Sequence, residues 1–223
     1  MQAITLLNTQ HTKHGKCNSA ELLKILTYLK PDVIFCECTE QAHEIFKKHF
    51  RSESSLVELI SIEEYIESNN AVALYIDIDI DYSIRNDELN YMFKFFNKYD
   101  AYKILEQEHY ESLYSGGFRY LNSEKCIKLI RAKKQIEIEL LEFGGMMKQT
   151  LAETYERFNI EIDTREDAMV DRIYGHSKNN SYEQAVFITG CGHRQSIIEK
   201  IKVMDRSQET KLNWRFDISD FID

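Results

Sequence analysis

The sequence contains little glycine and almost no proline, with eight and one of them among 223 residues. These two residues most often interrupt helices and strands, so the chain is neither loop-rich nor of low complexity. The five cysteines (positions 17, 36, 38, 126 and 191) are an odd number without zinc-finger spacing. We therefore expect reduced thiols in place of a disulfide framework or a structural zinc site.

Long apolar runs and an excess of positive charge are also missing. No stretch is long enough to span a bilayer, and the first residues lack the basic start and cleavage site of a signal peptide. Acidic residues outnumber basic ones by 37 to 28, which gives a net charge of −9. Non-specific binding to nucleic acid or to anionic lipid needs the opposite charge. We expect a cytoplasmic protein with no nucleic-acid or membrane partner.

What the chain does contain is an alternation of strand-like and helix-like segments. Strand-like runs cover residues 4–7, 33–36, 71–76, 186–189 and 212–218. The helix signals between them are Asn18 or Ser19 as a cap for a helix to Leu29, Thr39 as a cap for a helix to Phe50, a capping box at Ser61 for a helix ending at Asn69, Thr164 as the start of a further helix, and a last helix at 195–203. This alternation predicts parallel pairing with right-handed crossovers. We expect a single α/β domain over residues 1–223, with a mixed, largely parallel central sheet flanked by helices.

The middle of the chain has a different character. From about residue 87 to residue 158 the pattern is long, charged and helical, with breaks at Ser115-Gly116-Gly117 and at Gly144-Gly145. We predict a helical insertion or cap over residues 85–160.

Two segments far apart in the chain follow the same plan, in which an apolar run leads through a three-residue turn to a histidine. One ends at His11 and the other at His193. The turns begin with Asn8 and Gly190, and asparagine and glycine tolerate a positive φ, so both turns are expected to make the same sharp bend. If the two strands are parallel neighbours, both imidazoles reach the carboxyl edge of the sheet, where open α/β sheets bind ligands.

A carboxylate is expected at the same edge. Glu37 directly follows the apolar run at 33–36. Cys36 and Cys38, its neighbours, would point away from it as small buried side chains. The alternative for Glu37 is a solvated loop residue or a carboxylate at a helix start.

Arg165 stands out in its local context. In the helix expected to begin at Thr164 it occupies the first turn, where the helix dipole disfavours a cation. An arginine there can point into a pocket and hold a carboxylate, phosphate or carbonyl oxygen. The alternative is a surface ion pair with Glu161 or Asp163.

The remaining histidines carry weaker signals. His14 follows His11 by three residues, but its loop beside a glycine fixes no common face, so it is a minor candidate. His43, His49 and His109 lie in expected helices among charged neighbours, and we predict that they are surface residues.

An acidic run follows the strand-like segment at 71–76. Asp77, Asp79 and Asp81 alternate in it. Tyr82 occupies the position where an EF-hand loop requires glycine, and the preceding segment is a strand, so we do not expect an EF-hand. Asp77 or Asp79 can instead orient a histidine through a hydrogen bond, and a solvated sheet edge is the alternative.

Together these segments resemble the TraB/GumN/TIKI family, which belongs to a wider clan with erythromycin-esterase-like and ChaN-like proteins. The family pattern has two G-x-x-H motifs, a glutamate after the second core strand and an arginine in an R-x-x-x-M context. Gly190–His193 matches the second G-x-x-H motif, Pro31–Glu37 matches the glutamate segment and Arg165–Met169 matches the arginine segment. The first motif departs from the pattern, because Asn8 replaces its glycine ahead of His11. The resemblance covers about residues 1–80 and 160–203 and leaves out the helical middle.

The resemblance implies a hydrolase of amide or ester bonds whose four catalytic residues are His11, Glu37, Arg165 and His193. In a metal-dependent version, His11, Glu37 and His193 bind Mn²⁺, Co²⁺ or Zn²⁺ to activate a water molecule, and Arg165 stabilises the oxyanion. In a metal-free version, a histidine assisted by Glu37 is the general base. The substrate is expected to be a small molecule or a peptide. The alternative is a non-catalytic ligand-binding or signalling protein on the same scaffold, because the clan includes members without known activity.

Overall fold

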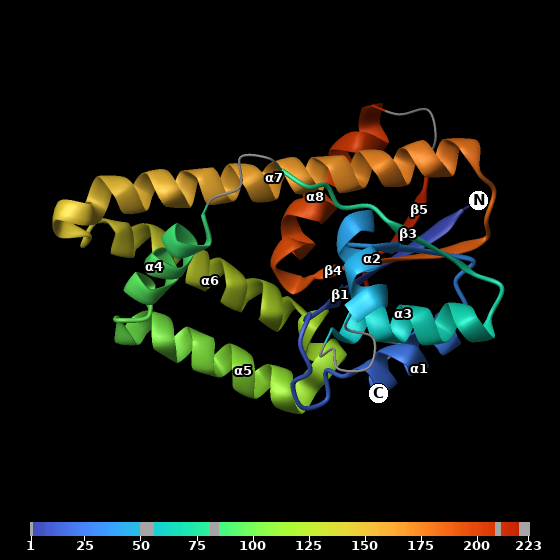
Figure 1. The fold of residues 1–223 in the computed structure, drawn as a ribbon, viewed down its shortest axis with the longest axis horizontal. Coiled ribbons are helices and arrows are strands. Elements are labelled where there is room, and N and C mark those ends of the chain that lie inside the picture. The colour runs from blue at the N-terminus through green and yellow to red at the C-terminus, as the bar shows by residue number, and fades with distance from the viewer. Residues whose placement is uncertain (1, 50–55, 81–84, 208–210, 219–223) are drawn as a thin grey trace.

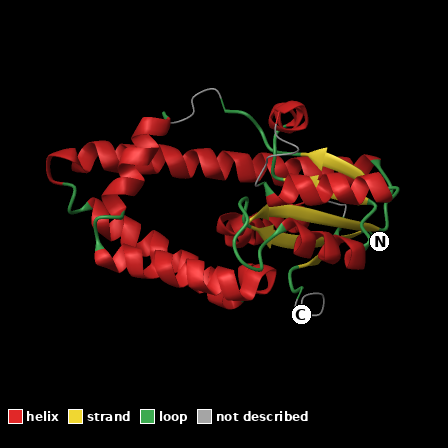
Figure 2. Ribbon diagram, turned by 60° about the horizontal axis from the view of Figure 1, so that its bottom comes forward, coloured by secondary structure: helices red, strands yellow, loops and turns green. Residues whose placement is uncertain are grey.

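Five parallel strands form the centre of the computed structural model, which describes residues 2–49, 56–80, 85–207 and 211–218. The strands are β1 (Ala3–Thr9), β2 (Val33–Cys36), β3 (Val72–Tyr75), β4 (Gln184–Gly190) and β5 (Asn213–Arg215). They lie in one sheet (Figure 2), and their order in it is β3-β2-β4-β1-β5. The predicted α/β fold with flanking helices is confirmed. The sheet is not mixed, however, since every pairing between the described strands is parallel.

Eight helices and two short 3-10 turns make up most of the remaining described chain (Figure 1). They are α1 (Ser19–Leu29), α2 (Glu40–His49), α3 (Val57–Ser68), α4 (Asn86–Phe96), α5 (Asp100–Leu121), α6 (Glu124–Leu141), η1 (Gly145–Met147), α7 (Lys148–Asn179), η2 (Cys191–His193) and α8 (Arg194–Ser207). Within the described ranges, no helix combines the length and the apolar character that a bilayer span requires.

Two helical layers cover the two faces of the sheet. Successive residues of a strand point to opposite faces, so each buried strand supplies side chains to both layers. On one face, Leu7, Ile34 and Val186 pack with α1 and α3. On the other face, Leu6, Phe35 and Phe187 pack with α8 and the second half of α7. This two-sided burial explains why the central strands are almost continuously apolar.

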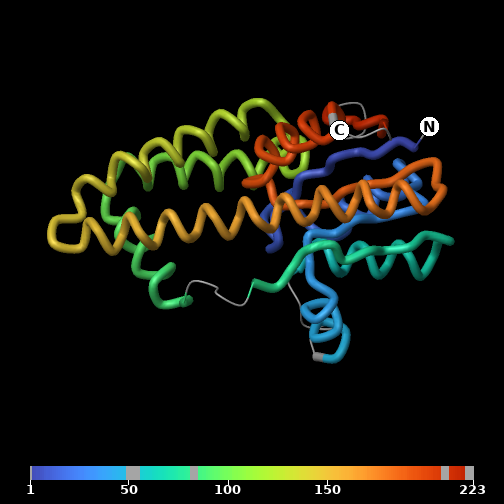
Figure 3. The backbone as a smooth tube through the Cα atoms, turned by 90° about the horizontal axis from the view of Figure 1, so that it is seen from above, coloured from blue at the N-terminus to red at the C-terminus, as the bar shows by residue number. Residues whose placement is uncertain are grey.

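The remaining helices form an arm that extends away from the sheet (Figures 1 and 3). The arm consists of α4, α5, α6 and the first half of α7, and it has a separate core of buried side chains that includes Met92, Phe96, Leu140 and Leu151. The predicted insertion at 85–160 contains these helices. The separate helix that was expected to begin at Thr164, just after this insertion, does not exist, because α7 continues without interruption from the arm tip onto the sheet.

Thr164 and Ser61 are therefore not helix caps. Thr164 Oγ1 donates a hydrogen bond to the Ile160 carbonyl, and Ser61 Oγ donates to the Val57 carbonyl. Each hydroxyl thus bonds to the preceding turn of a continuing helix, as Ser and Thr do in helix interiors. In both cases a capping pattern was present in a segment that tertiary packing holds as uninterrupted helix.

Other local signals agree with the structure. Asn18 accepts a hydrogen bond from the Glu21 N–H as the cap of α1, and Thr39 Oγ1 accepts one from the Ala42 N–H at the start of α2. Gly117 bends α5 with φ 51° and ψ −135°, and a Cβ there would lie 2.8 Å from Lys16 Cβ. The glycine thus lets the end of α5 approach the loop after β1. Phe50 and Asp81, which belong to two of the patterns above, lie outside the described residues.

Candidate active site

The carboxyl ends of β1, β2 and β4 meet at one edge of the sheet. β1 and β4 are parallel neighbours in a register that pairs Thr9 with Gly190. β2 lies on the other side of β4, with Cys36 opposite Ile188. His193, His11 and Glu37 follow these strand ends, and α7 brings Arg165 to the same edge. The structure thus brings together all four predicted site residues.

Glu37 lies at the centre of the group, and its side chain is only 4% exposed. One carboxylate oxygen, Oε2, accepts hydrogen bonds from Thr189 Oγ1 and from the Gly190 N–H, both at 2.7 Å. The other oxygen, Oε1, lies 3.1 Å from both Arg165 Nη2 and His193 Nε2. Burial alone would raise the pKa of Glu37, but His193 and the Gly190 N–H outweigh it and hold this pKa far below the ordinary range. Glu37 is therefore ionised and fully hydrogen-bonded, which rules out the solvated alternative.

His193 lies between two carboxylates. Its Nε2 faces Glu37, and its Nδ1 lies 2.7 Å from Oε1 of Glu166 on α7. Burial would lower the pKa of His193, but the hydrogen bonds to Glu166 and Glu37 raise it to about 9. Both ring nitrogens therefore carry protons at neutral pH, and Ser196 Oγ provides a further donor to Glu166. The ring is a fixed positive charge beneath the site.

Arg165 is in the middle of α7, not in a first turn, and it does not form the alternative surface pair. Its Nε and Nη2 donate to the carboxylate of Asp77 at 3.0 and 2.6 Å, and Nη2 also reaches Glu37. Asp163, the alternative partner, pairs with Lys200. Asp77 thus orients an arginine, whereas we expected it to orient a histidine. Arg172, two helical turns after Arg165, donates to the Asp77 carbonyl and fixes the same segment.

His11 is the accessible member of the group, with 53% of its side chain exposed. Its Nδ1 lies 3.2 Å from Oε1 of Glu58, a buried residue in the first turn of α3. Thr9 Oγ1 donates to the same oxygen at 2.6 Å. The hydrogen bond to Glu58 raises the pKa of His11 to about 9, against an opposing effect of burial.

The Nε2 atom of His11 faces the space above Gly190. A Cβ on Gly190 would lie 3.7 Å from this atom, 3.6 Å from His193 Cδ2 and 3.5 Å from Glu37 Oε2. None of the described residues hydrogen-bonds to Nε2. One reactive nitrogen is therefore open to a ligand, next to three groups that are held in place.

Neither turn uses a positive φ, so the reason expected for Asn8 and Gly190 is wrong. Gly190 has φ −59°, and Lys30 is the one non-glycine residue with a positive φ in the described parts of the chain. Asn8 is a fully buried strand residue, and its Oδ1 accepts a hydrogen bond from Arg194 Nη1 at 2.6 Å. Asn8 therefore ties the end of β1 to the residue that follows His193.

The other histidines lie outside the group. The Nε2 atom of His14 contacts the Tyr110 carbonyl. The prediction that His43 and His109 are surface residues is wrong, since both are buried. His43 lies 2.8 Å from Glu63, and His109 lies 2.9 Å from Tyr120. The side chain of His49 is outside the described part of the structure.

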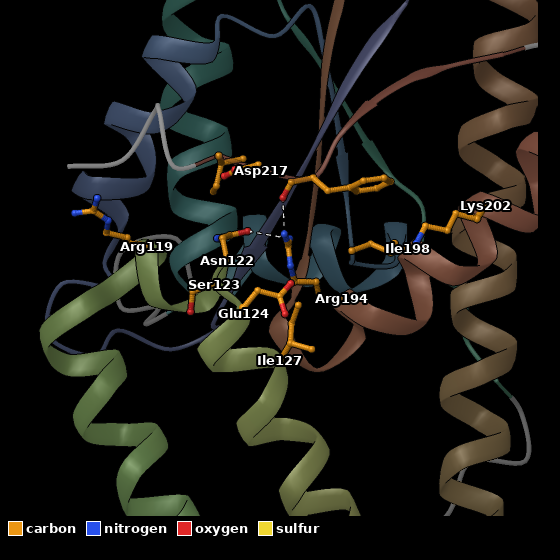
Figure 4. A pocket seen from close by; sticks show the side chains of 11 residues that line it. Arg119, Asn122, Ser123, Glu124, Ile127, Arg194, Ile198, Lys202 and Asp217 are labelled. Carbon is orange, nitrogen blue, oxygen red and sulfur yellow. Dashed lines mark hydrogen bonds between the residues drawn. The ribbon is translucent and has the colours of Figure 1, made fainter.

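Three cavities lie near residues next to the group, and none of them is lined by His11, Glu37, Arg165 or His193. One, of about 720 Å³, is bordered by Thr39, Asp77 and Arg172, and another, of about 250 Å³, is bordered by Cys191, Gly192 and Ser196. A third, of about 500 Å³, is bordered by Asn122, Ser123 and Arg194 (Figure 4). The first two cavities therefore border neighbours of the site, such as Asp77 and Gly192, and not His11 itself.

The predicted metal ligands are engaged in other bonds. Both nitrogens of His193 and both oxygens of Glu37 have hydrogen-bonding partners, and only Nε2 of His11 is open. Within the described ranges, no cluster of three or more His, Cys, Asp or Glu side chains is arranged to hold a metal ion. This arrangement does not fit a metal, and the metal-dependent version stays a prediction.

Comparison with known proteins adds no relative. The chain matches no protein-family model, and neither the curated proteins nor the solved structures include a match. The class of the protein therefore follows from the fold and the site alone, as an α/β protein with a histidine–carboxylate group at the carboxyl edge of its sheet.

The free energy of unfolding should fall between about pH 6 and about pH 10 as His193 loses its proton. Its pKa is about 9 in the fold against the ordinary 6.5. Its stabilisation is therefore complete below 6.5 and lost as the pH rises through 9, an effect on the order of 3 kcal/mol. Glu37 acts in the opposite direction, since its stabilisation is lost below its ordinary value of 4.5. Urea unfolding at a series of pH values measures both effects. In a His193→Asn variant, the free energy of unfolding should fall less between pH 6 and pH 10 than it does in the wild type. An equal fall in the two proteins would contradict the attribution to His193.

Proposed function

We propose that the protein is a hydrolase of ester or amide bonds in which His11 is the general base. The observation that carries the proposal is the His11–Glu58 pair, in which a buried carboxylate holds Nδ1 and Nε2 faces the space above Gly190. A carboxylate in this position fixes the tautomer, orients the ring and stabilises the imidazolium that forms when Nε2 takes a proton. Glu58 thus has the role that the metal-free version gave to Glu37.

The neighbouring groups supply the rest of the chemistry. Neutral His11 takes a proton from water, and the water oxygen attacks the carbonyl carbon of the substrate. Negative charge then develops on the carbonyl oxygen next to the positive charges of Arg165 and His193. Nη1 of Arg165 has no hydrogen-bond partner among the described residues, so it is the donor available to this oxygen. His11 finally returns the proton to the leaving oxygen or nitrogen, while Glu37 keeps Arg165 and His193 in position.

A screen of small esters and peptides, with and without Mn²⁺, Co²⁺ or Zn²⁺, tests the proposal. His11 acts as a base only when deprotonated. The value of kcat/KM should therefore rise about tenfold per pH unit and level off above an apparent pKa of about 9, the pKa of His11. Glu58→Gln removes the charge that raises the pKa of His11, so the apparent pKa of the profile should move toward 6.5.

Three other outcomes would contradict parts of the proposal. An apparent pKa that is unchanged in Glu58→Gln would exclude His11 as the base. Activity that appears only with an added divalent ion would favour the metal-dependent version. Silence across the whole panel would favour the non-catalytic ligand-binding alternative.

Gly190→Ala should lower kcat/KM at least about tenfold without unfolding the protein, because positioning in the site is strict. The new methyl group would occupy the space between His11 and His193, at ordinary contact distances of 3.5 to 3.7 Å from its neighbours. The φ of −59° suits alanine, and the N–H bond to Glu37 remains. Gly175→Ala is the matched control, since a Cβ there meets nothing within 4 Å. Equal activity in both variants would mean that this space is not used.

A further inference from the structure

We propose that the free edge of β3 is a docking site for an extended, basic segment of a partner polypeptide. β3 is the outermost strand of the sheet among the described residues, and it pairs on one side only, with β2. The N–H groups of Val72 and Ile76 donate to carbonyl groups in and just before β2. Because backbone groups alternate in direction along a strand, the N–H and C=O groups of Ala73 and Tyr75 point away from β2.

Four backbone groups are therefore open at this edge. Within the described part of the chain, no hydrogen bond is formed by the N–H or C=O group of Ala73 or of Tyr75. An extended peptide that adds a strand to a sheet bonds to groups of this kind. A segment of about five residues is long enough to bond to all four. The edge thus has the bonding pattern that an added strand requires.

The two edges of the sheet differ in how they are protected from such pairing. Free edges of natural proteins are commonly very short or carry charged residues or proline. β5, at the opposite edge, has three residues and ends at Arg215. β3 has the sequence Val-Ala-Leu-Tyr without charge or proline, and Val72 is 56% exposed. β3 therefore lacks the features that normally prevent a further strand from pairing.

A cavity of about 720 Å³ lies against this edge. The residues that border it belong to the start of α2, to β3 and the segment after it, and to α7, and they are 39–41, 73–79, Arg172 and His176. Leu74 and Tyr75 are partly buried, and they pack against the cores on opposite faces of the sheet. The cavity gives an added strand room beside β3, and the apolar side chains of this strand extend both cores.

The lining of the cavity is acidic, which defines the charge of the partner. It contains the three carboxylates of Glu40, Asp77 and Asp79 against one cation, Arg172. Burial lowers the pKa of His176, so this ring is neutral at pH 7. Glu40 and Asp79 are exposed, and neither forms an ion pair with another described residue. Lysine or arginine side chains at the ends of the added strand can pair with these two carboxylates.

A second copy of the chain is a poorer occupant. Each chain has a net charge of −9, and pairing two β3 edges would bring two acidic cavities together. Like charges oppose such an approach, whereas a basic segment is attracted from a distance. The partner is therefore a polypeptide segment with a short apolar or β-branched core that is flanked by lysine or arginine.

Fluorescence anisotropy tests the proposal with the full chain and three synthetic peptides. The first peptide alternates valine and threonine and has two lysines at each end. The second has glutamates in place of the lysines, and the third is the first with N-methyl groups on its central residues, which block both of its edges. The lysine peptide should bind with a Kd that rises with salt concentration. The other two should each bind at least about tenfold more weakly.

Ala73→Pro tests the backbone groups of the edge. Proline removes the outward N–H of this residue without removing a bond to β2, and edge strands tolerate proline in such a position. The lysine peptide should bind this variant at least about tenfold more weakly than the wild type. Urea unfolding establishes that the variant is folded. If it does not fold, the N-methylated peptide with the wild type decides the same point.

A second pair of variants tests the carboxylates. Glu40→Gln combined with Asp79→Asn should weaken binding of the lysine peptide about threefold to tenfold and reduce its salt dependence. Glu153→Gln combined with Glu156→Gln is the matched control, since it removes the same charge from exposed positions of α7 within the arm. The control should bind the peptide as the wild type does. Equal binding by both double variants would overturn the choice of a basic partner.

Two further outcomes would overturn the proposal as a whole. One is absence of binding by the lysine peptide, or equal Kd values for this peptide and its N-methylated form. The other is a dimer in sedimentation equilibrium that becomes a monomer in Ala73→Pro, which would make a second copy of the chain the occupant of the edge. The readout is binding at equilibrium, so the outcome is independent of the proposed hydrolase activity.

Discussion

Replacement of His11 by asparagine is expected to lower kcat by about 10²- to 10⁴-fold, the usual contribution of a general base. The fold should be retained, because the ring is 53% exposed and its one hydrogen-bonded partner, Glu58, keeps the donor from Thr9. Rates on the best substrate from the screen, together with urea unfolding of the same preparation, measure the two effects separately.

His14→Asn is the matched control, since it removes a second imidazole three residues further along the same loop. Its Nε2 contacts a carbonyl of α5 and takes no part in the site. We expect activity within about twofold of the wild type for this variant, as for surface substitutions away from a site. If both variants lost the same share of kcat, the loop would have only a structural role. If His11→Asn kept full activity, His11 would not be the general base.

Replacement of Arg165 by leucine should destabilise the protein by about 3 to 5 kcal/mol, the cost of breaking a buried ion pair from one side. The change leaves the carboxylate of Asp77, 7% exposed, without the guanidinium that pairs with it, and it removes one of the two cations beside Glu37, which is 4% exposed and keeps only His193. Arg165→Lys should lose less, because it keeps the charge but cannot bond to Asp77 in the same bidentate way. Chemical denaturation at neutral pH gives the free energies of unfolding of the wild type, Arg165→Leu and Arg165→Lys.

Lys200→Ala provides the comparison for Arg165. Lys200 also reaches α7, where it pairs with Asp163 and Asp167, but these carboxylates are 66% and 60% exposed. Exposed ion pairs contribute about 1 kcal/mol or less. A similar loss for Lys200→Ala and Arg165→Leu would contradict the view that burial decides the effect.

The sequence was sufficient to predict the strand-end residues of the site. His11, Glu37 and His193 each follow an apolar run, and the alternation of strands and helices already implies parallel pairing, which places the three ends at one edge. No counting along the chain, however, reveals that β4 enters the sheet between β1 and β2. That order depends on how helices from distant parts of the chain cover both faces of the sheet, which local patterns do not encode.

The carboxylates that hold the histidines were missed for a related reason. Glu58 and Glu166 lie on helices among other acidic residues, and nothing local distinguishes them from solvated side chains. Glu58 reaches His11 because the Val57 N–H bonds to the His11 carbonyl at 2.9 Å. Glu166 reaches His193 because α7 continues through the expected cap at Thr164. Long-range contacts of this kind also bury His43 and His109, which local polarity had assigned to the surface.

The continuity of α7 links the arm to the site mechanically. The helix has 32 residues and spans roughly 48 Å at 1.5 Å per residue. Its far end borders the arm core through Leu151, and its middle presents Arg165 and Glu166 to the sheet. Because the helix has no break, a tilt of the arm is passed along it. A change in the angle of the arm therefore displaces Arg165, which pairs with Glu37, together with Glu166, which pairs with His193.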